Sequence, residues 1–204
     1  MDTPRSQVPA GVTFAPNLRA ADGPTSSGRV LWHFTMTLDG FVAGPNHSFD
    51  WMMEGIDDTP GIVEAYAATT GAILCGRSGY DVDPDVSMIY GGLWSGPVFM
   101  LTRHPHDAVR ADGVTIISCD VAEAVRLGLE AAGGKNLEIF SADIGRQLLA
   151  LGLIDEIHLH VAPILLGDGI RLYDEPGGAP VRLELINGDR PLAEVTMQYR
   201  PAVA

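Results

Sequence analysis

From Val30 onward, the chain alternates between short runs rich in β-branched and aromatic residues and segments with helical or turn character. Runs of this kind are typical of β-strands that are largely buried. Eight of them qualify as candidate strands, at residues 30–37, 72–75, 98–102, 114–117, 137–140, 156–163, 181–185 and 194–200. The pattern therefore predicts a protein built around a β-sheet.

Three helices are predicted between these strands. The first begins at Pro60 and ends at Gly71, the second follows Asp120 as N-cap, and the third begins near Ser141 and runs through ADIGRQLLALG. Strands that alternate with helices favour a mostly parallel sheet covered on both faces. The last two strands are joined only by the turn sequence NGDRP, so we expect them to pair antiparallel at one edge. The expected fold is a three-layer α/β protein with an eight-stranded sheet.

The first 28 residues differ from the rest of the chain. They are rich in Pro, Ser, Gly, Ala and Thr and show no sustained periodicity, which predicts a flexible extension. An alternative is an arm that packs on a partner subunit through Val12, Phe14 and Leu18. Residues 29–204 are expected to form one domain, since 204 residues are few for two separate cores.

Charge and composition narrow the function. Hydrophobic residues make up 46% of the chain, and the formal net charge is −13, which disfavours nucleic acid and anionic membranes as partners. Without a long apolar run or a signal-peptide layout at the N-terminus, the chain is expected to be cytoplasmic. Its two cysteines, Cys75 and Cys119, lie in apolar runs and are expected to be buried free thiols. A small anionic cofactor is still compatible with this charge, because a few arginines and backbone amides can hold a phosphate locally.

Polar residues follow several strands at the edge where a parallel sheet binds its ligands. Arg77 and Ser78 come directly after the strand at 72–75, in the turn GRSGY, and Leu101, Thr102 and Arg103 end the strand at 98–102. An arginine and a glycine-opened turn suit a phosphate, although a solvated loop arginine explains Arg77 equally well on this motif alone.

The strand at 137–140 leads directly into a helix of small residues. Free amides at the start of that helix are suited to a pyrophosphate, although Asp143 opposes an anion there and Ser141 is also explained as an N-cap alone. The segment considered for cofactor binding consists of Phe140, Ser141, Ala142, Asp143, Ile144 and Gly145.

The loop after the first strand carries Asp39 and the pair Asp50 and Trp51. Turn chemistry and a core position for Trp51 are the alternatives to a functional role. His158 and His160 point to one face of their strand, but no cluster with ligand spacing supports a metal site. Signatures of a P-loop, a nucleophile elbow and a zinc deaminase are absent from the sequence.

Four segments in order, TMTLDGFVAG, CGRSGYD, VFMLTRHP and GLIDEIHLHVAPILLGDGIRLYD, resemble the dihydrofolate-reductase-like family of the riboflavin-biosynthesis reductase (RibD) C-terminal-domain type. The resemblance covers residues 29 to 200. It implies a homodimer whose sheet binds NADPH, with Arg77 and Ser78 near the 2′-phosphate and pyrophosphate and Thr102 and Arg103 beside the adenine ribose. It places residues 141–145 under the diphosphate and nicotinamide.

On the substrate side, the resemblance implies Asp39, Asp50, Trp51 and Tyr80. The expected activity is hydride transfer from NADPH to a C=N, C=O or C=C bond of a small heterocycle, which includes secondary metabolites and drugs. Asp50, then Asp39, then an ordered water are the proton-donor candidates.

The sequence departs from the family pattern at two places, and Phe140 in place of glycine motivates an alternative function. Phe140, Ser141 and Ala142 stand where many members have a Gly-Gly pair, and Gly79 stands where dihydrofolate reductases have Thr. The alternative is a non-catalytic binder that holds an aromatic compound through Trp51, Tyr80, Trp94 and Phe140. A riboflavin-pathway role is not expected because the fused deaminase domain is absent, and folate reduction is not expected because only Asp57 or Asp58 offers the necessary carboxylate.

Overall fold

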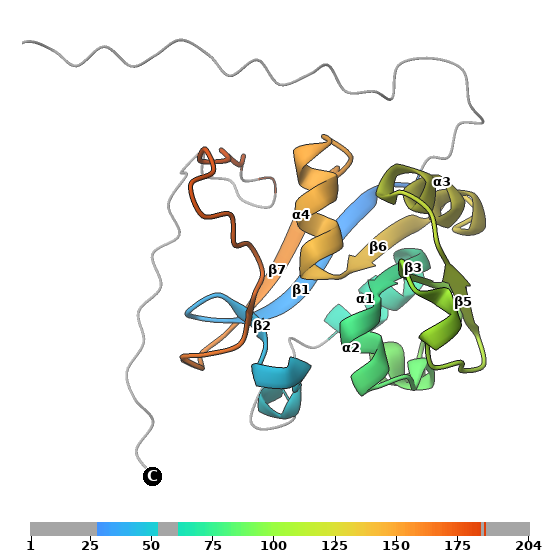
Figure 1. Ribbon diagram of the computed structural model, residues 1–204, viewed down its shortest axis with the longest axis horizontal. Coiled ribbons are helices and arrows are strands. Elements are labelled where there is room, and N and C mark those ends of the chain that lie inside the picture. The colour runs from blue at the N-terminus through green and yellow to red at the C-terminus, as the bar shows by residue number, and fades with distance from the viewer. Residues whose placement is uncertain (1–27, 53–60, 185, 187–204) are drawn as a thin grey trace, which may run out of the picture.

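A six-stranded parallel sheet forms the centre of the protein (Figure 1). The computed structural model describes residues 28–52, 61–184 and 186. Every neighbouring pair of strands in the sheet is parallel. The spatial order is β5 (Val114–Ile117), β4 (Val98–Leu101), β3 (Thr70–Gly76), β6 (Asn136–Phe140), β1 (Val30–Thr37) and β7 (Glu156–Ala162). The six predicted strands of the first 163 residues are therefore confirmed.

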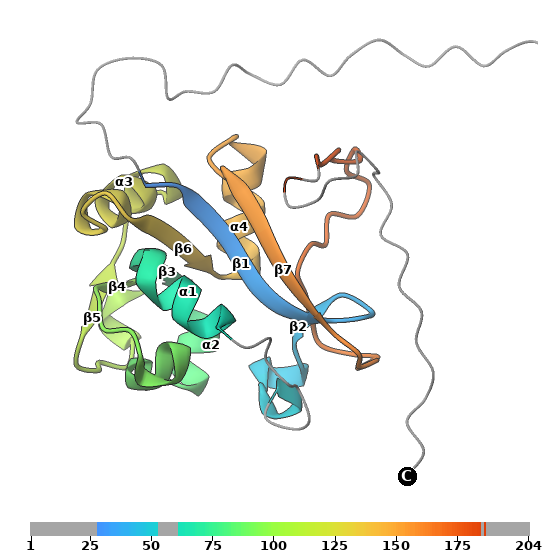
Figure 2. The same cartoon turned by 180° about the vertical axis from the view of Figure 1, so that it is seen from behind.

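Helices cover both faces of this sheet, as expected. Helices α3 (Val121–Ala131) and α4 (Ala142–Ala150) lie on the face toward the viewer in Figure 1. Helix α1 (Ile62–Thr69) lies on the opposite face, which Figure 2 shows. The short helix α2 (Arg77–Val82) directly follows β3. The three-layer α/β architecture follows from this arrangement.

Two helix starts are fixed by the N-caps that the sequence predicts. The side chain of Asp120 accepts a hydrogen bond from the amide of Glu123 at 2.8 Å, and Ser141 Oγ accepts one from the amide of Ile144 at 3.3 Å. Each cap satisfies an amide that has no partner inside its own helix.

The α3 and α4 face of the sheet is a hydrophobic core. Val30 and Trp32 of β1 point to this face and pack with Ile144 and Leu148 of α4. Gly145 permits the close approach, because a Cβ at that position would lie 2.0 Å from the Trp32 ring. The alternation of side chains along β1 directs the residues between them to the opposite face, where His33 stacks on Tyr66 of α1.

A small antiparallel sheet lies apart from the parallel one. It pairs β2 (Phe41–Ala43) with β8 (Ile170–Arg171), and neither strand was predicted, because both are too short to show a periodic pattern. The eight strands of the described residues thus divide into a parallel sheet of six and an antiparallel sheet of two.

The expected C-terminal edge is only partly described. Residues 181–184 form no strand, contrary to the prediction for 181–185, whereas residue 185 and the predicted strand at 194–200 lie outside the described residues. Within the described part, β7 is the edge strand of the parallel sheet.

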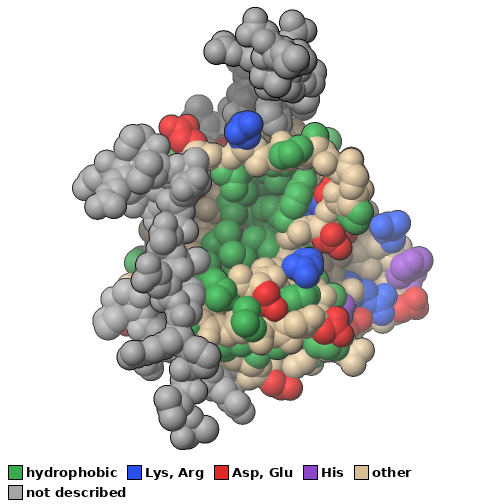
Figure 3. Space-filling model, turned by 90° about the vertical axis from the view of Figure 1, so that its left-hand side faces the viewer, with side chains coloured by type: hydrophobic (Ala, Val, Ile, Leu, Met, Phe, Trp, Pro, Cys, Tyr) green, Lys and Arg blue, Asp and Glu red, His purple; other side chains and the backbone are tan. Residues whose placement is uncertain are grey.

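Hydrophobic side chains gather in a hollow on the face that lies to the left in Figure 1 (Figure 3).

Four short 3-10 helices complete the described elements: η1 (Pro45–His47), η2 (Asp50–Met52), η3 (Val86–Gly92) and η4 (Pro105–Asp107). No helix in the described residues combines the length and hydropathy that crossing a bilayer requires. Both cysteines are free thiols. Cys75 is partly buried, but Cys119 is exposed, so the expectation that both are buried was wrong for Cys119, which lies in the loop just beyond β5.

Candidate active site

Three neighbouring strands end at one edge of the sheet and bring the predicted cofactor residues together. Strands β4, β3 and β6 are adjacent, with Cys75 of β3 beside Met100 of β4 and Phe140 of β6. Because the strands are parallel, their carboxyl ends share this edge. The segments 101–103, 77–78 and 140–145 therefore meet there, which the sequence predicted from three separate motifs.

The two arginines at this edge differ in their availability. The Arg77 guanidinium donates to Asp81 Oδ2 at 2.7 Å and to the carbonyl oxygens of His104 at 3.3 Å and Asp107 at 2.7 Å. It thereby fastens α2 to the loop after β4. Arg103 is exposed and makes no side-chain hydrogen bond or ion pair within the described residues. Arg103 is thus the better placed of the two to meet a phosphate.

The start of α4 presents a second group of donors. The first-turn amides of Ala142 and Asp143 have no partner inside the helix, since only Ile144 receives the Ser141 cap. Asp143 is directed along the helix, where it accepts from Arg146 at 2.9 Å and Gln147 at 2.8 Å. These contacts offset its negative charge, which was the main objection to an anion at this helix start.

The residues at this edge fit an anionic dinucleotide such as NADPH. Arg103 and the α4 amides are donors of the kind that bind phosphate. A Cβ on Gly76 would lie 2.9 Å from Ser141 Oγ, so the ends of β3 and β6 approach closely because residue 76 is glycine. The side chains of Phe140 and Ser141 take up space where a glycine pair would leave the backbone open, so the fit is tighter than that pattern gives.

A cavity of about 360 Å³ opens on the α1 side of the sheet, next to this edge. Its walls are mainly apolar and aromatic, and include Phe34, Val42, Phe49, Ile73, Ile89 and Phe140. Phe140 belongs to both places, because it ends β6 beside the predicted cofactor segment and also lines the cavity. The strand-end edge and the cavity are therefore contiguous.

Of the predicted substrate-side residues, Tyr80 lines the cavity. Its side chain is buried, and burial raises the pKa of the phenol, although the backbone of Ala111 acts in the opposite direction. Trp94 is instead part of a small core with Ile73 and Val98, and its indole nitrogen donates to the Thr70 carbonyl at 3.0 Å. Trp94 is not among the cavity-lining residues, so its predicted contact with a ligand remains a prediction.

Asp50 and Trp51 lie on η2 and are not among the cavity-lining residues. Asp50 is exposed and accepts from Ser48 Oγ at 2.9 Å. The Trp51 indole nitrogen is buried and has no hydrogen-bond partner within the described residues. Their predicted roles in catalysis and substrate binding therefore remain predictions.

Asp39 fixes the end of β1. It accepts from the Thr37 hydroxyl at 2.6 Å and from the backbone amides of Leu166 at 3.1 Å and Gly167 at 2.8 Å. Desolvation opposes ionisation, but these hydrogen bonds prevail and lower the pKa of Asp39 from 3.8 to about 2. A carboxyl group that is ionised at neutral pH is a poor proton donor, which argues against Asp39 as the acid.

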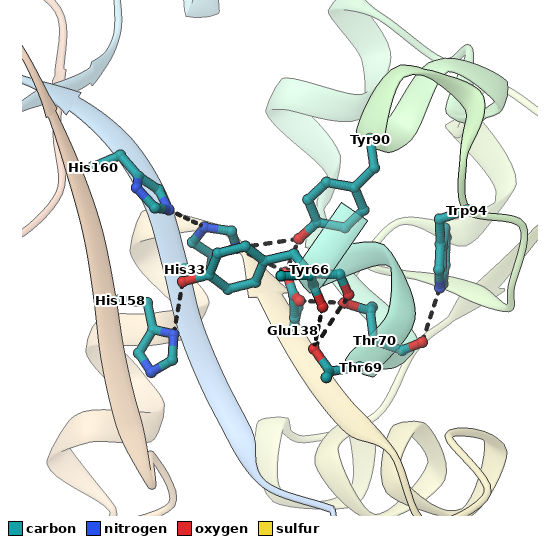
Figure 4. A network of polar contacts seen from close by, with 10 residues as sticks. His33, Tyr66, Thr69, Thr70, Tyr90, Trp94, Glu138, His158 and His160 are labelled. Atoms are coloured by element: carbon teal, nitrogen blue, oxygen red, sulfur yellow. Dashed lines mark hydrogen bonds and ion pairs between the residues drawn. The ribbon is translucent and has the colours of Figure 1, made fainter. Parts of the chain in front are cut away.

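Sequence reasoning missed a buried polar cluster on the α1 face (Figure 4). Glu138 of β6 is fully buried and accepts from three side chains: His33 Nδ1 at 2.9 Å, the Tyr90 hydroxyl and the Thr70 hydroxyl. Burial, and then the charge of Glu138, raise the pKa of Tyr90, which keeps it a phenol and a donor. His33 and Tyr90 both line the cavity.

The cluster continues toward β7. His33 Nε2 lies 2.9 Å from His160 Nε2, and the His33 ring stacks on Tyr66 of α1 at 3.9 Å between centroids. The Tyr66 hydroxyl lies 2.9 Å from His158 Nδ1 (Figure 4). No group of three or more potential ligands in the described residues is arranged to hold a metal ion. The sequence signal that could have indicated this cluster is a carboxylate and a histidine inside the apolar runs LEIF and LWHF.

Comparison with known proteins agrees with the fold. Residues 80–189, more than half of the chain, match the RibD C-terminal domain. The uncharacterized protein YyaP of Bacillus subtilis (strain 168) is 27% identical over 158 residues, which cover 71% of this chain and 80% of YyaP. The chain therefore belongs to the RibD C-terminal domain family, and the resemblance that its motifs indicated is confirmed.

Two solved structures show the same fold. One is the diaminohydroxyphosphoribosylaminopyrimidine deaminase/5-amino-6-(5-phosphoribosylamino)uracil reductase of Thermotoga maritima, with a TM-score of 0.61, 16% identity and coverage of 78% of this chain and 52% of that chain. The other is dihydrofolate reductase from Enterococcus faecalis complexed with NADP(H), with a TM-score of 0.50, 11% identity and coverage of 73% and 79%. The dihydrofolate-reductase-like fold is thus shown.

Proposed function

We propose that this protein is an NADPH-dependent reductase that transfers a hydride to a C=N, C=O or C=C bond of a small heterocyclic substrate. The observation that carries the proposal is the shared position of Phe140. This residue joins the edge that presents phosphate-binding donors to a largely apolar cavity, so a nicotinamide at the end of β6 would face a ring in that cavity. A pocket of this size and character suits a small organic ligand.

The comparisons support the class of reaction. Two structurally similar proteins are named as reductases, and one of them was solved with NADP(H). For the relative from Thermotoga maritima the name specifies a phosphoribosylated uracil as substrate. Phosphorylated pyrimidines are therefore one substrate class to weigh, beside uncharged metabolites and drugs.

Each part of the site has a role in this proposal. Arg103 and the first-turn amides of α4 hold phosphate groups of the cofactor, and the apolar walls of the cavity exclude water from the reacting atoms. Bound NADPH supplies the hydride. Phe140 would limit the space left for the nicotinamide, because its side chain ends β6 and lines the cavity.

The heteroatom of the reduced bond also needs a proton. Asp39 is ionised, so we assign the proton to His33, which lines the cavity between Glu138 and His160. Glu138 accepts from Nδ1, which orients the ring, and one of the facing Nε2 atoms of His33 and His160 must carry a proton for them to lie 2.9 Å apart. This assignment replaces Asp39 and places His33 beside Asp50 as a candidate.

Titration of the purified protein with NADPH, followed by nicotinamide fluorescence, tests the proposal. We expect saturable binding that Arg103→Ala weakens about tenfold, since a lost phosphate contact of about 1.4 kcal/mol is a factor of ten. Lys135→Ala, which removes an exposed cation just before β6, at the opposite edge of the sheet, is the matched control and should bind normally. The reductase assignment fails if the wild-type protein does not bind NADPH at high micromolar concentration.

A non-catalytic binder of small aromatic compounds is the second candidate. Phe140–Ser141–Ala142 in place of a glycine pair and the full engagement of Arg77 favour it. It predicts ligand binding in the cavity without any effect of NADPH.

We also propose that the protein acts as a homodimer; elution at the mass of a 21.7 kDa monomer in gel filtration would contradict that.

A further inference from the structure

The charges around the cavity restrict what it can bind. None of its described lining residues is lysine or arginine, and the two carboxylates among them, Asp83 and Asp85, lie in the exposed segment after α2. Hydrogen bonds from the Ser87 side chain, and then from the Ser87 amide, lower the pKa of Asp85 and keep it ionised. Apart from His33, the polar residues that line the cavity are therefore either anionic or neutral.

The floor of the cavity adds to this character. His33 and Tyr90 reach the cavity surface, and the carboxylate of Glu138 lies directly behind both of them (Figure 4). His33 Nδ1 is therefore already occupied by the Glu138 carboxylate. A phosphate or carboxylate on a ligand would find no free positive charge at this floor.

Arg103, at the adjoining strand-end edge, is assigned to the cofactor phosphates in the proposed function, and two other described arginines are engaged by protein groups. Arg77 is held by Asp81 and by two backbone carbonyls, and Arg171 lies over the Phe41 ring and donates to the Asp39 carbonyl at 3.0 Å. Neither lines the cavity.

An anion that enters an apolar cavity loses its hydration, and this cost is recovered only through an opposite charge or several hydrogen bonds. We propose that the cavity takes a planar heterocycle that is uncharged or cationic and carries neither phosphate nor carboxylate. This inference rests on the proposed function in taking the cavity as the substrate site. Of the two substrate classes, phosphorylated pyrimidines and uncharged metabolites or drugs, it selects the uncharged compounds.

Two matched pairs of fluorescent probes test the proposal on the full-length protein: riboflavin against riboflavin 5′-phosphate, and pterin against pterin-6-carboxylate. Within each pair the ring is the same and the anionic group is the difference. We expect the uncharged member to bind at least tenfold more tightly. Failure of both uncharged probes to bind at millimolar concentration, or equal or tighter binding of an anionic member, overturns the proposal.

A pair of adjacent substitutions locates the binding. Ile89→Trp fills the cavity, which Ile89 lines, whereas Met88→Trp adds the same bulk at a residue that is exposed and does not line it. We expect Ile89→Trp to weaken binding of the uncharged probes at least tenfold and Met88→Trp to leave it unchanged. Equal effects of the two would place the probes outside the cavity and contradict the proposal.

A gain of function tests the electrostatic reason. Met52 lines the cavity and is partly exposed, so Met52→Arg introduces the missing positive charge at its mouth, and Met52→Gln is the uncharged control. Met52→Arg should reduce the preference for riboflavin over its 5′-phosphate at least fivefold, whereas Met52→Gln should not. An unchanged preference in Met52→Arg counts against charge as its cause.

The same protein preparations are titrated with NADPH, which separates the two proposals. Probe discrimination without NADPH binding means that the reductase assignment fails while the substrate class stands. If NADPH binds but the anionic probes are preferred, the reductase assignment stands and the proposed substrate class fails.

Discussion

The two faces of the central sheet are built from the same strands and differ in almost every other respect. Toward α3 and α4, β1 presents Val30 and Trp32 to a dry core that includes Leu148. Toward α1, the same strand presents His33 to a buried carboxylate and to a cavity. The period of two along a strand makes this division possible, so one face stabilises the fold and the other is free to carry chemistry.

Breaking the dry face should have the largest effect on stability. Leu148→Ala removes a fully buried side chain of α4, and we expect a loss of about 2 to 5 kcal/mol in the free energy of unfolding, because a cavity is left behind. Leu151→Ala changes a half-exposed leucine at the end of the same helix and should cost about 0.5 kcal/mol or less. Urea denaturation measures both, and similar losses would contradict the location of the core.

The polar face responds to a smaller change in chemistry. Glu138→Gln keeps the size of the side chain but replaces an acceptor oxygen with an amide donor, so at least one of the bonds from His33, Tyr90 and Thr70 is lost. We expect a cost of about 1 to 3 kcal/mol in urea denaturation and weaker binding of ligands in the cavity. Glu64→Gln, at an exposed position of α1, is the control and should change neither.

The contribution of Asp39 to the free energy of unfolding is expected to depend on pH. Its folded pKa of about 2 lies below the ordinary 3.8, so its ionised form adds stability above pH 3.8, and this contribution is lost as the pH falls through about 2. Asp39→Asn should therefore be about 1 to 2 kcal/mol less stable than wild type at pH 7, with the gap closing between pH 4 and pH 2. A gap that stays constant over that range would show that the charge of Asp39 is not responsible.

The smallest effect on stability is expected from removing the N-caps of α3 and α4. Ser141→Ala and Asp120→Ala each remove one N-cap, at α4 and α3, and each should cost about 1 kcal/mol in thermal or urea unfolding. Ser141 lies beside Phe140 at the start of α4, whereas Asp120 follows β5, the strand at the far side of the sheet, so Ser141→Ala should alter NADPH affinity more than Asp120→Ala does. If Asp120→Ala changes NADPH affinity as much, the cofactor does not lie at the start of α4.

The sequence predicted the strands of the parallel sheet and three helices because those elements are long enough to show periodicity and caps. It did not predict β2 and β8, whose two or three residues carry no pattern and whose pairing depends on contacts between positions far apart in the chain. The same limit applies to the site. The strand ends were predictable because a parallel sheet gathers them, which holds for Arg103 and Ser141.

The partners of individual side chains were not predictable. Nothing in the turn GRSGY indicates that Arg77 is occupied by Asp81 and the carbonyls of His104 and Asp107. Likewise, Trp94 and Tyr80 are both aromatic residues near the sheet, and only the fold shows that one packs in the core and the other lines the cavity. His33 and Glu138 are more than 100 positions apart in sequence, and their pairing depends on adjacent strands.

The central claim is that the strand-end edge and the cavity form one site, with Phe140 between them. The most direct test is an NMR measurement of proton–proton nuclear Overhauser effects between the nicotinamide C4 proton of bound NADP⁺ and the phenylalanine rings of the protein, with Phe140→Leu to assign the signal. A cross-peak to Phe140 that is absent in Phe140→Leu, with none to the buried Phe41 of β2, is the predicted result. Bound NADP⁺ without a contact to Phe140 would contradict it.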